Sequence, residues 1–110
     1  MPKFAANLTL LFTEMDFMSR FRAAANCGFG AVEILFPYDH RPGELAERLF
    51  HNGLKIVLFN SPPGRWGGGD RGLGALPGRR AEFEESIGRA LEYAKALNCK
   101  QIHVLAGVPP

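Results

Sequence analysis

Most side chains of this sequence that suit acid–base chemistry or ligand binding stand within or just after four short apolar runs. If the runs are parallel strands, these side chains meet at the carboxyl ends, where α/β proteins bind their ligands. The sequence therefore predicts a pocket at that edge. The candidates are Asn7, Thr9 and Phe12 after the first run, Glu33, Phe36, Tyr38, Asp39 and His40 in and after the second, Asn60, Trp66, Asp70 and Arg71 after the third, and His103 in the fourth.

Glu33 and His103 are titratable residues inside apolar runs. A carboxylate within AVEILF is costly to bury unless it is paired or wet, so Glu33 either faces the pocket or forms a structural ion pair. His103, in QIHVL, is either a polar or acid–base group of the pocket or a core histidine whose ring nitrogens have partners. Both alternatives stay open for each residue.

The Gly/Pro-rich segment at residues 60–79 contains seven of the 13 glycines, three of the eight prolines and the single tryptophan. Three interpretations compete for it: a disordered tether, a phosphate cradle and a lid over the pocket. A phosphate-binding Walker loop needs Gly-Lys-Ser/Thr at its end, whereas Gly69 is followed by Asp70 and Arg71. A tether would expose Trp66 and Leu73 to water.

Long loops inside compact domains are usually functional, so we favour the lid. Two arginines of this segment, Arg65 and Arg71, either offer guanidinium groups to a substrate carboxylate or lie solvated on the surface.

The residue types alone do not compose a complete catalytic or metal site. The histidines stand at positions 40, 51 and 103, without the short spacing of metal ligands. No Ser/His/Asp arrangement can be argued, because Ser61 is the only serine near the expected pocket. We therefore assign no catalytic residue and no metal ligand.

Alternating apolar and amphipathic segments predict the element order βαβαβαβ. Such alternation is typical of a parallel sheet covered by helices, either a doubly wound sheet or part of a (β/α)8 barrel of roughly 250 residues. A lone sheet of four strands would expose both edges, so we expect the rest of the fold, or a partner, outside this chain. Strands are expected from Lys3 to about Leu8 and at residues 31–36, 54–59 and 101–105. Helices are expected before Gly28, from Pro42 to about Asn52, and at residues 81–97. The last helix is expected to bury one face, formed by Phe83, Ile87, Leu91, Ala94 and Leu97.

Composition favours an ordinary globular protein. Hydrophobic residues make up 46% and charged residues 22%, and the net charge of +2 is too small to indicate a nucleic-acid partner. Cys27 and Cys99 are expected to be buried free thiols, which fits a cytoplasmic protein. We find neither the apolar region of a signal peptide nor a run of about 18 apolar residues that would span a membrane.

Four segments of the chain closely resemble the N-terminal part of the hydroxypyruvate isomerase family. They are FAANLTLLF, GFGAVEILFPYD, NSPPGRWGGGDRGLGALPGRRAEFEESI and YAKALNCKQIHVLAG, and they cover essentially all 110 residues. That family has the xylose-isomerase-like TIM barrel fold. The resemblance implies an α/β fold in which residues 1–110 form the N-terminal half of a (β/α)8 barrel, with parallel strands one to four and outer helices.

The resemblance also implies an activity: interconversion of hydroxypyruvate and tartronate semialdehyde (2-hydroxy-3-oxopropanoate) by proton transfer between adjacent carbons. The catalytic glutamates of the family, on the fifth and eighth strands, and the ligands of a divalent metal of the Mg or Mn type would lie outside this chain. The 110 residues alone are then expected to be inactive. The implied substrate-binding residues are Asn7, Phe36, Tyr38, Asn60, Trp66, Arg71 and His103.

Two alternatives stay beside this interpretation. One is another xylose-isomerase-like sugar isomerase or epimerase, and the other is a non-catalytic half-barrel that binds or oligomerises. We expect a small hydroxy-keto acid as the partner, no nucleic acid and no membrane, and a homo-oligomer stays open.

Overall fold

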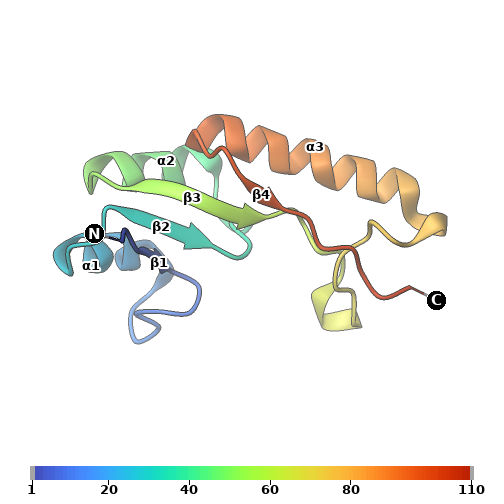
Figure 1. Cartoon of the computed structure of the whole chain (residues 1–110), viewed down its shortest axis with the longest axis horizontal. Coiled ribbons are helices and arrows are strands. Elements are labelled where there is room, and N and C mark those ends of the chain that lie inside the picture. The colour runs from blue at the N-terminus through green and yellow to red at the C-terminus, as the bar shows by residue number, and fades with distance from the viewer. Residues whose placement is uncertain (1, 110) are drawn as a thin grey trace.

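The computed structural model describes residues 2–109 of the chain. The predicted order of strands and helices is confirmed, with three 3-10 turns added (Figure 1). The elements are β1 (Ala5–Asn7), η1 (Phe17–Ser19), α1 (Arg20–Asn26), β2 (Ala31–Ile34), α2 (Pro42–His51), β3 (Lys55–Asn60), η2 (Trp66–Gly68), η3 (Pro77–Arg79), α3 (Arg80–Leu97) and β4 (Ile102–His103).

The four strands form one parallel sheet in the order β1-β2-β3-β4. Each strand pairs with the strand that precedes or follows it along the chain. This order fits a barrel, in which strands are added around a ring, rather than a doubly wound sheet, in which the order reverses at a switch point. The register places Asn7 opposite Glu33, and Asn60 opposite His103, at the carboxyl edge.

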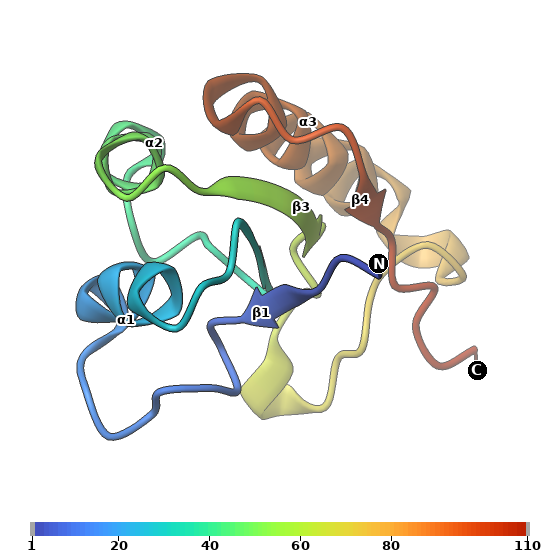
Figure 2. The same cartoon turned by 60° about the vertical axis from the view of Figure 1, so that its left-hand side comes forward.

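All three α-helices cover one face of the sheet, and the other face is left without helices (Figure 2). Side chains alternate between the two faces of a strand. Ala6, Val32, Ile34, Ile56 and Phe59 face the helices and are buried. Ile56 and Phe59 share this face although they stand three positions apart, because the pairing of β2 with β3 shifts by one residue after Val32. They pack against an apolar stripe on each helix: Phe21 and Ala24 of α1, Leu45 and Leu49 of α2, and Ala90, Ala94 and Leu97 of α3.

The buried face of α3 differs from the predicted one. Leu91 was expected to be buried but is 57% exposed, whereas Tyr93 is buried. Tyr93 donates a hydrogen bond to the backbone oxygen of His40, and its ring packs on that of Tyr38. The small side chain of Ala90 lets this side of the helix approach the sheet closely. Together these contacts rotate the helix away from the face with the larger aliphatic residues.

The two cysteines differ in burial, and only one of them agrees with the prediction. Cys99 is a buried free thiol, as predicted, and burial raises its pKa. The prediction was wrong for Cys27, which is exposed because it stands at the end of α1, where the chain turns back toward β2. Of the helices in residues 2–109, even α3, the longest, lacks the apolar composition needed to cross a membrane.

Candidate functional site

The face of the sheet without helices carries polar side chains at its carboxyl edge. Asn7 and Glu33, on β1 and β2, are joined by a 3.0 Å hydrogen bond from Asn7 Nδ2 to Glu33 Oε1. Asn60 and His103, on β3 and β4, are joined at 3.1 Å between Asn60 Oδ1 and His103 Nδ1. The sheet register thus brings the four predicted strand-end residues into two pairs on the same face.

Asn7 holds the Glu33 carboxylate in place. Its own Oδ1 accepts the backbone amides of Thr9 and Leu10, which fixes the rotamer and turns Nδ2 toward Glu33. Within residues 2–109 no cation lies within 4.0 Å of the Glu33 carboxylate. The structural ion pair that the sequence left open is therefore not formed, and Glu33 is a half-buried carboxylate with an amide partner.

His103 is exposed, so the alternative of a satisfied core histidine is wrong. Asn60 is 9% exposed, and its side-chain oxygen accepts a hydrogen bond from the imidazole. An amide oxygen can only accept, so Nδ1 carries the proton in this pair, and Nε2 is left as an acceptor without a partner within residues 2–109. The pair therefore presents one ring nitrogen that can accept a hydrogen bond from a ligand.

Tyr38 lies on the opposite side of Asn60 from His103. Its hydroxyl donates to the backbone oxygen of Asn60, and its ring packs edge-on against Phe59 and Tyr93. Burial raises the pKa of the Tyr38 phenol above its ordinary value, an effect that the nearby Arg89 guanidinium opposes. The structure thus places Tyr38 in the layer between sheet and helices, where it supports Asn60.

The segment at residues 61–79, which we call the lid, is ordered and follows β3 beyond the carboxyl edge of the sheet (Figure 1). Leu73 is 3% exposed, and Gly72 forms an antiparallel bridge with Ala106. The Ser61 amide donates to the backbone oxygen of His103 at 2.9 Å, so the first residue of the lid is tied to β4. The disordered tether is therefore wrong.

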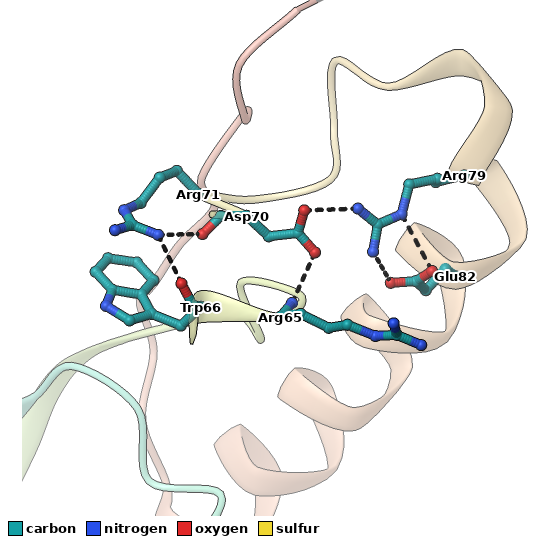
Figure 3. Close-up of polar contacts among 6 residues, drawn as sticks. All are labelled: Arg65, Trp66, Asp70, Arg71, Arg79 and Glu82. Atoms are coloured by element: carbon teal, nitrogen blue, oxygen red, sulfur yellow. Dashed lines mark hydrogen bonds and ion pairs between the residues drawn. The ribbon is translucent and has the colours of Figure 1, made fainter. Parts of the chain in front are cut away.

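Asp70 joins the two ends of the lid (Figure 3). Its Oδ2 accepts the Arg65 amide and its Oδ1 accepts Arg79 Nη1, both at 2.7 Å. Arg79 also forms an ion pair with Glu82 of α3. The hydrogen bond from Arg79, with that from the Arg65 amide, lowers the pKa of Asp70 to about 2. Since the Arg65 amide already donates to this carboxylate, the amide is not free to bind a phosphate, which disfavours the phosphate cradle.

Phe36, Trp66 and Arg71 form a stack over the carboxyl end of β2. The Trp66 and Phe36 ring centroids are 5.3 Å apart, and the Arg71 guanidinium carbon lies 3.8 Å from the Trp66 centroid. The Arg65 side chain extends toward α3 instead (Figure 3). The predicted pair of guanidinium groups is thus divided, and only Arg71 stands beside the indole.

No metal site is formed by the side chains that the structure describes. Within residues 2–109, no three His, Cys, Asp or Glu side chains come together in a way that could hold an ion. Glu33 and His103, the nearest donors to the pocket, each have an asparagine partner instead. The divalent metal implied by the resemblance stays a prediction about residues outside this chain.

A separate hollow of about 770 Å3 lies at the other end of the strands, beside Phe4, Gly28 and Lys55. In parallel α/β folds the amino ends of the strands serve stability, and ligands bind at the opposite edge. The candidate site is therefore the polar edge with its lid.

The seven substrate-binding residues that the resemblance implies fall into three groups. Asn7, Asn60 and His103 lie on the polar edge; Phe36, Trp66 and Arg71 form the stack; Tyr38 lies behind the sheet. The role of Asp70 and Arg79 was missed, because no local pattern shows that two residues nine positions apart will pair. The Glu33 partner was also missed, although the equal positions of Asn7 and Glu33 in their strands could have suggested it.

Comparison with known proteins gives concordant matches. The family model described as "Xylose isomerase-like TIM barrel" matches residues 21–110. The chain is 56% identical over all its 110 residues to 2-oxo-tetronate isomerase of Cupriavidus necator, and covers 42% of that protein. It is 46% identical over 110 residues to hydroxypyruvate isomerase of Escherichia coli, of which it covers 43%.

Among solved structures, a crystal structure from Brucella melitensis described as AP endonuclease, family 2, matches with a TM-score of 0.97 at 49% identity. The match covers 98% of this chain and 42% of that one. The chain thus spans about two fifths of the length of the relatives that it matches.

Proposed function

The chain belongs to the xylose isomerase-like TIM barrel family, and on that premise we propose that it is part of an isomerase of small hydroxy-keto acids. The resemblance to hydroxypyruvate isomerases is confirmed by relatives that match the whole chain. We propose that the reaction interconverts hydroxypyruvate and tartronate semialdehyde, with residues 1–110 supplying strands one to four of one barrel domain. The observation that carries the proposal is 46% identity to the Escherichia coli hydroxypyruvate isomerase along all 110 residues.

The reaction moves a proton between adjacent carbons, and its intermediate carries oxygens on both of them. Such an intermediate needs hydrogen-bond partners for the oxygens and a base and acid for the proton. Asn60 and His103 suit the first task, because a fixed amide and imidazole at one edge can hold neighbouring oxygens. Glu33 is held by Asn7 and shapes the same edge.

We do not assign the proton transfer to Glu33. The resemblance implies that the catalytic carboxylates and the ligands of a Mg or Mn type ion lie outside this chain. Such an ion would polarise the two substrate oxygens when bound. The side chains described here would bind and orient the substrate, so the 110 residues alone are expected to show no turnover.

A second candidate is the isomerisation of a four-carbon acid. It is favoured by the 56% identity to the Cupriavidus necator protein named 2-oxo-tetronate isomerase, a higher value than for the hydroxypyruvate isomerase. The two acids share the carboxylate and keto group and differ in chain length. The part of the pocket outside this chain would decide between them.

Two interpretations from other classes are less well supported. A non-catalytic half-barrel would leave the polar pairs without a task, and a folded oligomer of the 110-residue chain would favour it. A nuclease is named by the Brucella melitensis structure, but the net charge of +2 gives this chain no strongly basic surface. We propose a cytoplasmic protein with a small-molecule partner and no nucleic-acid or membrane partner.

The test is an isomerase assay of the protein produced from the complete reading frame that contains this sequence. Hydroxypyruvate and 2-oxo-tetronate are supplied separately, with Mg2+ or Mn2+ and then with a chelator. We expect turnover of one acid that the chelator abolishes, and none from the 110-residue chain alone. No turnover of either acid by the complete protein would refute the proposal, and strong turnover by the 110 residues would refute the assignment of the catalytic groups.

A further inference from the structure

Arg71 is held at the carboxyl edge of the sheet by contacts that use only part of its guanidinium group. One nitrogen, Nη1, donates to two backbone oxygens, that of Trp66 at 3.0 Å and that of Asp70 at 2.7 Å (Figure 3). The planar group lies over the Trp66 indole at 3.8 Å. Its orientation is therefore fixed from below and from one side before any ligand arrives.

The other edge of the same guanidinium, formed by Nε and Nη2, has no hydrogen-bond partner within residues 2–109. Two parallel N–H groups on one edge match the two oxygens of a carboxylate. Arg71 is exposed and its indole partner is 48% exposed, so this edge is open to a ligand. The geometry is that of a preorganised carboxylate receptor.

The charge of Arg71 is also left unbalanced by its neighbours. The nearest acidic residue, Asp70, turns its carboxylate away toward the Arg65 amide and Arg79 (Figure 3). Arg79 and the Asp70 carboxylate neutralise each other. An anion that approaches Arg71 thus meets a positive group whose local acid is already paired.

The position of the stack connects it to the candidate site. Phe36 follows β2, and its ring packs on Trp66 with centroids 5.3 Å apart. This fixes the indole, and with it Arg71, beyond the carboxyl end of β2, at the same end of the sheet at which Asn60 pairs with His103. A small acid held by its carboxylate at Arg71 would therefore lie at the end of the sheet that carries the polar pairs.

We propose that Arg71, oriented on Trp66, is the subsite that binds the substrate carboxylate and selects hydroxy acids over neutral hydroxy compounds of the same skeleton. This inference deepens the proposed function and rests on it for the identity of the substrate. It decides between the two roles that the sequence left open for Arg65 and Arg71, and assigns the carboxylate to Arg71 alone.

The test uses binding rather than turnover. The protein produced from the complete reading frame is used, because the 110 residues alone would expose both edges of the sheet. Isothermal titration calorimetry measures its binding of sodium glycerate, which carries a carboxylate. Glycerol, in which a neutral CH2OH replaces that carboxylate, is titrated in parallel. Circular dichroism of each variant verifies that the chain is folded.

We expect glycerate to bind saturably and glycerol to give no heat of binding at equal concentration. Arg71→Gln should raise the apparent Kd for glycerate by about 10-fold or more, since one charge-assisted pair is lost. Arg71→Lys keeps the charge without the two-pronged edge, so it should bind with intermediate affinity. Arg65→Gln is the matched control, because it removes the same charge from the same lid on the side facing α3, and it should stay within about 2-fold.

Glycerate binding that is as tight in Arg71→Gln as in the wild type would overturn the proposal. An equal loss in Arg65→Gln would do so too, because it would mean that net charge rather than the Arg71 edge attracts the acid. A complete protein that binds glycerate through Arg71 but turns over neither acid would keep the subsite and refute the isomerase. If the complete protein turns over one acid and Arg71→Gln leaves its KM unchanged, the isomerase would be kept and the subsite refuted.

Discussion

Substituting Gly72 by alanine is expected to release the lid while leaving the sheet intact. Gly72 adopts φ +106°, and a Cβ atom built there would lie 2.0 Å from the backbone oxygen of Leu105 and 2.4 Å from its carbonyl carbon. These are backbone atoms, so no rotamer change relieves the overlap. The bridge between Gly72 and Ala106, which ties the lid to the segment after β4, must therefore open.

The magnitude follows from what the bridge holds together. An alanine at this φ costs about 1–3 kcal/mol in backbone strain. Opening the bridge also loses the hydrogen bond from the Ala75 amide to the Ala106 oxygen, about 1 kcal/mol. Re-exposing Leu73, now 3% exposed, costs up to about 2 kcal/mol. The hydrogen bond and the burial of Leu73 therefore hold the wild-type lid closed by about 3 kcal/mol, and the strain at residue 72, together with the overlap against Leu105, offsets that stabilisation.

Hydrogen exchange measured by mass spectrometry separates the lid from the core. Amides of residues 61–79 should exchange up to about 100-fold faster in Gly72→Ala, whereas peptides from β2 and β3 should keep their protection. Gly67→Ala is the control within the same lid, since its Cβ would meet no atom within 4 Å. A lid that exchanges at the wild-type rate in Gly72→Ala, or as fast in Gly67→Ala, would refute this account of how the lid is held.

Three further predictions concern the groups behind and within the site. Tyr38→Phe removes the hydrogen bond to Asn60 and should cost about 1 kcal/mol in the free energy of unfolding at neutral pH. Because burial raises the pKa of Tyr38, the neutral phenol stabilises the fold below about pH 10, and this stabilisation is lost as the pH rises further. Chemical denaturation at pH 8 and 11 should therefore show that the free energy of unfolding falls less between these pH values in Tyr38→Phe than in the wild type. The pKa of Asp70 is lowered to about 2 by Arg79, so the order of the lid should persist above about pH 4 and be lost as the pH falls toward 2; Trp66 emission should follow this change in the wild type and not in Asp70→Asn. His103→Ala removes an exposed side chain and should alter the free energy of unfolding by less than about 0.5 kcal/mol, while KM for the accepted acid rises about 10-fold in the complete protein, as steady-state kinetics and thermal unfolding would show.

The strands and the polar edge could be predicted because their signals are local. An apolar run of about five residues specifies a buried strand, and parallel strands place their carboxyl ends at one edge. Asn7, Asn60 and His103 end or closely follow such runs, and the structure gathers them there. Contacts between neighbouring strands, such as that of Asn7 with Glu33, follow from the register once the strand order is known.

Predictions failed where the backbone leaves the regular period. Tyr38 lies four residues beyond the end of β2, so strand alternation no longer decides which way its side chain points, and it packs against Tyr93 instead of lining the polar edge. The prediction of which face of α3 is buried failed for a related reason. Helical periodicity allowed Leu91 or Tyr93 on the buried face, and a hydrogen bond to His40, more than 50 residues away in the chain, decided between them.

The lid is better described as a fixed wall of the pocket than as a flap. Its first residue is bonded to the backbone of His103, its middle is bridged to Ala106, and its end is held through Asp70, Arg79 and Glu82 to α3. A hinge needs two ends that stay while the middle moves, but here the middle is the part that pairs with a distant segment. A wall so fastened can hold Arg71 in one orientation, which a moving loop could not do without losing the entropy of ordering it on every binding event. Two glycines of the segment serve close contact rather than flexibility: Gly72 against Leu105, and Gly64 against Asp70 and Leu73.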